Sequence, residues 1–308
     1  MKNKKTFLFI VSLIFSLLSF AQKFEMTFRS APDSSRNFYF AVIPEKEIKA
    51  WMVLLPGYGE APSNVFNDSK ITNSAAAENI LLILPSLKNW DTFYLDSTSQ
   101  NILSSIIIEV VSKYNLQNKP FIIGGFSLGA SGAVKYAERA LQAESKLPNP
   151  AMLFGIDPPL DLERMLISID KAIVRNSSEA SVKEAKFIKE KMKDLFGKSN
   201  EELRKYSAYT YTDNTNKHIA SLKNIPVRLY TEPDINWQIE NRARDFYDLN
   251  SSDCSAMIND LRILGNKQAE LIVTSGKGYR INGTRNPHSW SIVDEKELMN
   301  WIKNYLKI

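Results

Sequence analysis

Seven short apolar runs bounded by turn residues recur along the chain, and they constrain its fold more than any other feature. From residue 50 onward most of them are continuous rather than alternating, which is typical of strands buried on both faces of a sheet. The runs are FYFAVI (38–43), AWMVLL (50–55), ILLIL (80–84), FIIGG (121–125), AMLFGI (151–156), PVRLYT (226–231) and AELIVT (269–274).

Segments with apolar residues at helical spacing lie between several of these runs. Residues 101–116 and 132–143 show this spacing, and residues 294–308 add an acidic first turn, which suits the positive end of a helix dipole. The alternation of strand and helix predicts an α/β fold, with a mostly parallel central sheet flanked by helices.

The interval between Ile156 and Pro226 is too long for a simple crossover between strands. It contains a charged segment, 182–196, in which apolar residues form one stripe of a helix. We therefore predict a helical cap insertion at 157–224, beside the end of the sheet where ligands bind.

The N-terminus has the composition and order of a secretory signal peptide. A basic start, MKNKK, precedes an apolar core of about fifteen residues, which is shorter than the ~20 residues that span a bilayer. We expect residues 1–21 to be removed after Ala21, and the mature chain, 22–308, to be secreted or periplasmic without a stable membrane anchor.

Charge and cysteine content exclude several classes of function. Removing residues 1–21 takes away three lysines and no acid, so the net charge falls from +5 to +2, which predicts no nucleic-acid partner. Cys254 is the single cysteine, so no intramolecular disulfide is expected. No histidines and cysteines stand at the spacing of metal ligands, and we expect no metal.

Ser127 is the candidate nucleophile. It stands in GFSLG (125–129), directly after one apolar run and before a helical pattern. A serine on a sharp strand-to-helix turn has strained backbone angles, so positions two residues away on either side must lack side chains. Gly125 and Gly129 meet this requirement, whereas the glycine patterns of dinucleotide and phosphate loops are absent.

The general base must be one of two histidines, His218 and His288, because the chain has no others. His288 follows the last apolar run and precedes the C-terminal helix, so its loop returns to the carboxyl end of the sheet, where ligands bind. We predict that His288 is the base and that His218 lies in the cap or on the surface.

An acid should orient the histidine. Asp234 follows the PVRLYT run and stands in the order Ser, Asp, His, so we favour it. Glu232 is the near alternative and Asp157, after the preceding run, the more distant one.

Two backbone N–H groups should stabilise the developing oxyanion. We predict that one belongs to Leu128, which follows the nucleophile. The other is expected in the glycine-containing PGYG loop after residue 55, at Tyr58.

The PGYG loop, the GFSLG turn, the EPD segment (232–234) and the PHSW segment (287–290) together resemble those of the α/β-hydrolases, over about residues 40 to 307. The chain looks most like the secreted bacterial esterases of this superfamily, and more distantly like acyl-carbohydrate esterases. The resemblance implies a serine esterase that needs no cofactor, with Ser127, Asp234 and His288 as its triad.

Aromatic residues near these motifs are candidates for substrate contact. Trp90 follows a strand, and Trp237 and Trp290 flank the acid and the histidine. They favour an uncharged small-molecule or carbohydrate ester over a highly charged substrate. The alternatives are a serine peptidase of the same fold and a non-catalytic binding protein that retains a triad-like set of residues.

Overall fold

The computed structural model describes residues 23–29, 36–87, 92–197 and 199–308. The predicted signal peptide at 1–21 lies outside the described residues, and so does Trp90. No helix in the described part of the chain is long and apolar enough to cross a membrane.

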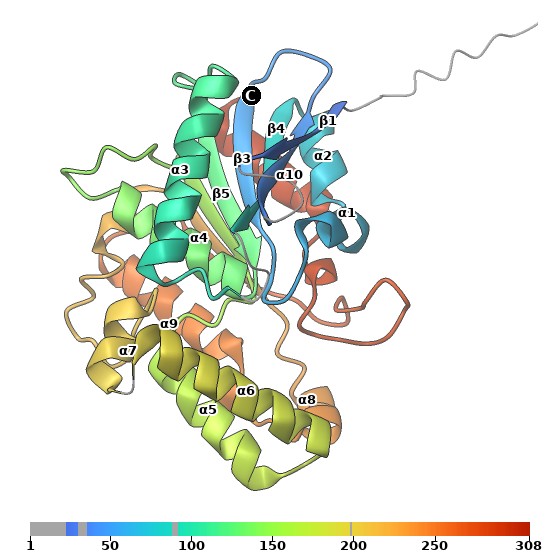
Figure 1. Ribbon diagram of the computed structural model, residues 1–308, viewed down its shortest axis with the longest axis vertical. Coiled ribbons are helices and arrows are strands. Elements are labelled where there is room, and N and C mark those ends of the chain that lie inside the picture. Colours follow the sequence, from blue (N-terminus) through green and yellow to red (C-terminus); the bar gives the residue numbers. More distant parts are fainter. Residues whose placement is uncertain (1–22, 30–35, 88–91, 198) are drawn as a thin grey trace, which may run out of the picture.

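An eight-stranded sheet forms the centre of the molecule (Figure 1). The strand order is β1-β2-β4-β3-β5-β6-β7-β8. β2 pairs antiparallel with β1 and β4, and the pairs from β4 to β8 are parallel. The strands are β1 (Lys23–Phe28), β2 (Asn37–Ile43), β3 (Ala50–Leu55), β4 (Ile80–Leu87), β5 (Phe121–Phe126), β6 (Met152–Ile156), β7 (Val227–Thr231) and β8 (Ala269–Val273).

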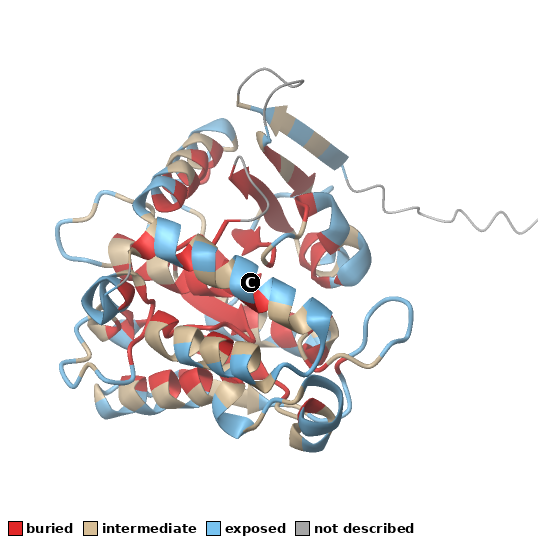
Figure 2. Cartoon of the chain, turned by 60° about the horizontal axis from the view of Figure 1, so that its bottom comes forward, coloured by how far each residue is buried: buried red, intermediate tan, exposed pale blue. Residues whose placement is uncertain are grey.

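Helices cover both faces of the sheet, and buried side chains form a hydrophobic cluster on each face. One cluster packs α3, α4 and α9 on the sheet, and the other packs α2 and α10. Figure 2 shows buried strands at the centre and exposed residues on the outer surfaces of the helices. The helices are α1 (Val65–Asp68), α2 (Ile71–Ala77), α3 (Ser97–Lys113), α4 (Leu128–Ala140), α5 (Leu162–Arg175), α6 (Glu179–Phe196), α7 (Asn200–Tyr206), α8 (Ile235–Arg242), α9 (Asn250–Ile263) and α10 (Glu295–Leu306).

The predicted fold class is confirmed, and each of the seven apolar runs is a strand, β2 to β8, with ends within three residues of those expected. β1 was not predicted. Its sequence, KFEMTF, alternates apolar and polar residues, and it pairs only with β2 at the edge of the sheet. Its apolar side chains Phe24, Met26 and Phe28 remain substantially exposed. An edge strand of this kind does not need the continuous apolar run that buries the interior strands on both faces.

Three helices, α5, α6 and α7, lie between β6 and β7, at the lower end of the molecule in Figure 1. α6 is the helix predicted at 182–196. Its buried residues include Met192 and Phe196, and the Phe196 ring packs edge-on against Phe93, with 5.6 Å between ring centroids. The helices therefore pack on the body of the protein, while the bounds 157–224 for a cap insertion stay a prediction.

A buried ion pair ties α5 to α9. Arg164 donates to Asp253 through both Nε and Nη2, and the Nη2–Oδ2 distance is 2.7 Å. The Asp253 side chain is 1% exposed, and its Oδ2 also accepts the backbone N–H groups of Leu160 and Asp161. Since α9 packs on the sheet, this one carboxylate fixes the start of the helical segment relative to the sheet.

Replacing Asp253 with Ala should lower the free energy of unfolding by about 3–5 kcal/mol, because Arg164 and two backbone N–H groups would lose a buried partner. The matched control is Asp170→Ala, which removes an exposed pair between α5 and Lys189 and should cost less than about 1 kcal/mol. Urea denaturation measures both losses, and equal losses would contradict an anchoring role for Asp253.

Candidate active site

Ser127 occupies the sharp turn between β5 and α4. Its backbone angles, φ 53° and ψ −128°, are strained for a residue with a side chain. The turn packs tightly on the end of β3. A Cβ added to Gly129 would lie 2.2 Å from the Pro56 carbonyl oxygen, and one added to Gly125 would lie 2.8 Å from that of Leu55. Both glycines are therefore required by close backbone contact.

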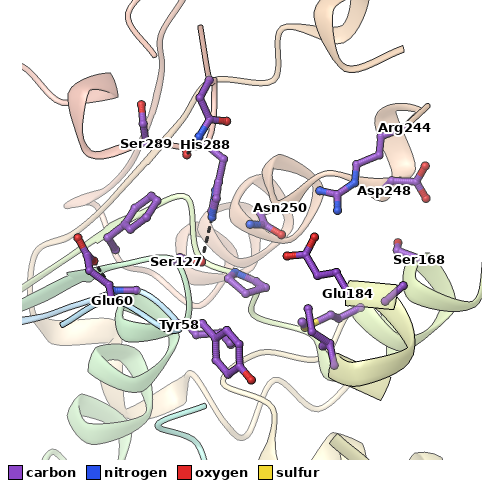
Figure 3. Close-up of a pocket in the computed structure, with 18 of the residues that line it drawn as sticks. Tyr58, Glu60, Ser127, Ser168, Glu184, Arg244, Asp248, Asn250, His288 and Ser289 are labelled. Carbon is purple, nitrogen blue, oxygen red and sulfur yellow. Dashed lines mark hydrogen bonds between the residues drawn. The ribbon is translucent and has the colours of Figure 1, made fainter. Parts of the chain in front are cut away.

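His288 contacts Ser127. Its Nε2 lies 2.9 Å from the Ser127 Oγ, as drawn by the dashed line in Figure 3. The imidazole belongs to the segment 274–289 between β8 and α10, called here the histidine loop. The ring packs against Phe126, with 4.7 Å between ring centroids. The chain therefore brings together a hydroxyl and an imidazole that are 161 residues apart.

Asp157, and not the favoured Asp234, contacts the other side of the imidazole. The Asp157 Oδ2 lies 2.5 Å from the His288 Nδ1, and its Oδ1 accepts the Thr231 hydroxyl at 2.8 Å. Asp157 follows β6, which is the strand directly beside β5, whereas Asp234 follows β7, one strand further away. The distant alternative of the sequence analysis is therefore the acid that reaches the histidine, while the Asp234 carboxylate is bound to Arg285.

Asp234 and Glu232 hold the histidine loop in place. Asp234 caps the start of α8 and pairs with Arg285, a residue of the loop. Glu232 pairs with the same Arg285 and accepts the backbone N–H groups of Lys277 and Gly278. Burial raises the pKa of Glu232, but these hydrogen bonds outweigh burial and hold the pKa below its usual value. Both acids thus contact the loop that carries His288, and neither contacts its ring.

His218 lies away from Ser127, in the segment between α7 and β7. It is half-buried, and burial together with the charge of Lys135 lowers its pKa. It is not among the described residues that line the pocket at Ser127.

The two predicted oxyanion residues both lie at the pocket. Leu128 is the first residue of α4, where backbone N–H groups have no partner within the helix. Tyr58 lies in the loop after β3, next to Gly57, whose N–H is bound by the Glu60 carboxylate at 2.7 Å. The other Glu60 oxygen accepts the Trp290 indole N–H at 2.8 Å. Burial raises the pKa of Glu60.

A pocket of about 640 Å³ opens beside Ser127. Its walls come from the loop after β3, the Ser127 turn, α5, α6, the segment before α9 and the histidine loop. Figure 3 labels Tyr58, Glu60, Ser127, Ser168, Glu184, Arg244, Asp248, Asn250, His288 and Ser289 around it. The helical segment between β6 and β7 therefore contributes directly to the wall of this pocket.

Of the three tryptophans predicted to contact substrate, one lines the pocket. Trp290 lines the pocket, although it is only 4% exposed and its indole N–H is bound to Glu60. Trp237 is not among the described lining residues, and Arg242 lies over its ring. Trp90 lies outside the described residues. The sequence analysis did not single out Arg244 or Glu184, which do line the pocket.

Solved structures with the same arrangement of strands and helices include a carboxyl esterase from the fungus Tuber melanosporum. It has 13% sequence identity and a TM-score of 0.60, and the alignment covers 93% of this chain and 88% of the other. The MPT51 protein of Mycobacterium tuberculosis has 12% identity and a TM-score of 0.59, with 93% and 99% covered. An S-formylglutathione hydrolase from Agrobacterium tumefaciens has 14% identity and a TM-score of 0.55, with 94% and 96% covered.

The chain has the α/β-hydrolase fold. No protein-family model matches its sequence, and no curated protein matches it. Within this hydrolase fold, Ser127, Asp157 and His288 follow β5, β6 and β8, so all three lie at the carboxyl edge of the parallel sheet. Among the described residues, no group of three or more His, Cys, Asp and Glu side chains is placed to hold a metal ion.

The tight turn of the hydrolase fold predicts a steric effect at Gly129. Gly129→Ala should lower the free energy of unfolding by about 3 kcal/mol or more, because the new methyl group would overlap backbone atoms of Leu55 and Pro56. The control is Gly276→Ala, where space is open but φ is +67°, so the cost should be about 1 kcal/mol. Chemical denaturation compares the two, and a smaller loss at Gly129 would refute the close contact.

Proposed function

We propose that this protein is a serine hydrolase that cleaves carboxylic esters through an acyl-enzyme on Ser127. The observation that carries the proposal is the chain of contacts from Ser127 Oγ to His288 Nε2 at 2.9 Å, and from His288 Nδ1 to Asp157 Oδ2 at 2.5 Å. A hydroxyl, an imidazole and a carboxylate in this sequence of contacts form the arrangement that activates a serine nucleophile.

The acid partner sets the direction of proton transfer. With Nδ1 protonated and donating to Asp157, the lone pair on His288 Nε2 faces the Ser127 hydroxyl. As Ser127 attacks the ester carbonyl carbon, Nε2 takes the hydroxyl proton, and Asp157 stabilises the imidazolium that forms. The Thr231 hydroxyl, bound to the other Asp157 oxygen, keeps the carboxylate oriented.

The negative charge that develops on the carbonyl oxygen needs donors. We assign this role to the backbone N–H groups of Leu128 and Tyr58, which flank Ser127 from α4 and from the loop after β3. The Gly57 N–H is bound to the Glu60 carboxylate, which orders the loop that carries Tyr58.

Collapse of the tetrahedral intermediate breaks the bond to the alcohol oxygen, which receives its proton from His288 Nε2. A water molecule then gives a proton to His288 and attacks the acyl carbon. The Ser127 oxygen leaves and takes this proton back, which releases the carboxylic acid. No step draws on a cofactor. The carboxyl esterase and the S-formylglutathione hydrolase that share the fold support this class of reaction.

We also propose that the protein acts after export, as its leader-like N-terminus suggests.

Ser127→Ala should abolish labelling by a fluorophosphonate probe and lower hydrolysis of p-nitrophenyl butanoate at least about a thousandfold. His288→Ala should cause a comparable loss, because the hydroxyl would lack its base. His218→Ala is the matched control and should stay within about twofold of the wild type. Labelling that persists in Ser127→Ala, or equal losses for the two histidines, would reject these assignments.

Asp157→Asn should lower kcat at least about a thousandfold, because an amide cannot stabilise the imidazolium and favours the wrong tautomer of His288. Asp234→Asn, which alters only the pairing of Arg285 and the cap of α8, should lower kcat less than about tenfold. Steady-state kinetics of both variants, with melting temperatures to verify folding, decide between the two acids. A larger loss for Asp234→Asn would return it to the catalytic role.

A further inference from the structure

Two of the four arginines that line the pocket are neutralised by carboxylates, and two are not. Arg164 pairs with Asp253, and Arg175 pairs with Asp245 and Asp248. In the described part of the chain, no carboxylate lies within ion-pair distance of Arg244 or Arg280. Both side chains are exposed; Arg280 belongs to the histidine loop, whereas Arg244 follows α8, and its backbone N–H is bound to the Gln238 carbonyl.

The backbone around Arg244 is anchored. Ala243, the residue after α8, adopts a left-handed conformation (φ 51°), and the Arg244 N–H donates to the Gln238 carbonyl. Arg175 of α5 donates to the Ala243 carbonyl at 2.6 Å. In Figure 3 the Arg244 guanidinium points into the pocket, toward Asn250 and Glu184. The arginine is therefore held toward the pocket by contacts that leave its own guanidinium open.

The acids closest to Arg244 in sequence are bound to other residues. Asp245 pairs with Lys171 and Arg175, and Asp248 pairs with Arg175. Glu184 of α6 faces Arg244 across the pocket, and its charge acts on the guanidinium without forming an ion pair. Arg244, a cation without an ion pair, and Glu184, an anion, thus border the same pocket.

Arg244 also lies within electrostatic reach of the Ser127 site. Partial loss of hydration, together with the charge of Arg242, lowers the pKa of Arg244, and the charges of Glu184, Asp248 and Asp157 oppose this. Asn250 lies between the two regions in Figure 3 and donates to the Asp157 backbone carbonyl at 2.9 Å. Ser127 and Arg244 line the same pocket, so one small molecule bound there can contact both.

We propose that the substrate carries a carboxylate, which Arg244 binds while Ser127 attacks the ester. This inference rests on the proposed function and names its substrate class. A guanidinium presents its N–H groups in a planar fork that matches the two oxygens of a carboxylate. Glu184, on the opposite wall, disfavours a doubly charged group such as a phosphate monoester, because like charges would face each other across the pocket. A monoanion fits both charges best.

The test uses two matched pairs of esters, since the carboxylate can belong to the acyl part or to the alcohol part. The acyl pair is p-nitrophenyl hydrogen adipate and p-nitrophenyl hexanoate. The alcohol pair is 4-carboxybenzyl butanoate and 4-methylbenzyl butanoate. The readout is the ratio of kcat/KM for the charged ester to kcat/KM for the neutral ester, within each pair.

In at least one pair the wild type should prefer the charged ester about tenfold or more. Arg244→Gln should lower that ratio at least about tenfold, mainly through KM, and Glu184→Gln should raise it by removing the opposing charge. Arg242→Gln is the control for net charge, because Arg242 lies over Trp237 and is not among the described lining residues. It should leave the ratio within about twofold of the wild type.

Preference for the neutral ester in both pairs would overturn the inference while leaving the proposed function intact, and so would equal changes in Arg244→Gln and Arg242→Gln. A protein that hydrolyses none of the four esters, and whose Ser127 resists the fluorophosphonate probe, would overturn the proposed function and the inference with it.

Discussion

The contact between the backbone of Gly129 and the carbonyl groups of Leu55 and Pro56 is the constraint on which the site depends. It places the first turn of α4 directly against the end of β3. Because the chain leaving β3 continues into the loop that carries Tyr58, the same contact sets the distance between Ser127 and that loop. The strained backbone conformation of Ser127 persists because β5, β3 and α4 fix the chain on both sides of the turn.

The sequence was most informative where a short motif meets a strict steric requirement. The continuous apolar runs correspond to strands because only a sheet covered on both faces buries such segments completely. The GFSLG turn was recognisable because close backbone contacts at Gly125 and Gly129 leave no room for a side chain. With only two histidines, the position of His288 after the last strand was enough to bring it to Ser127.

Features that depend on spatial order were less accessible. Asp157 and Asp234 both follow strands that end at the same edge, and only their partners in the folded chain, His288 for Asp157 and Arg285 for Asp234, separate them. Nothing local to EPD shows that its two acids bind Arg285 and not the imidazole. Arg244 is one of 39 lysines and arginines. What distinguishes it is that the acids close to it in the sequence, Asp245 and Asp248, pair with Arg175 instead. The edge strand β1 was not predicted because its apolar residues alternate with polar ones and do not form a continuous apolar run.

Glu60 links the two loops that meet over the pocket. One of its oxygens binds the N–H of Gly57, beside Tyr58, and the other binds the indole of Trp290, two residues after the imidazole. A displacement of either loop is therefore transmitted to the other. The loop with the imidazole and the loop with Tyr58 therefore share one carboxylate as a common anchor, and loss of that carboxylate would release both at once.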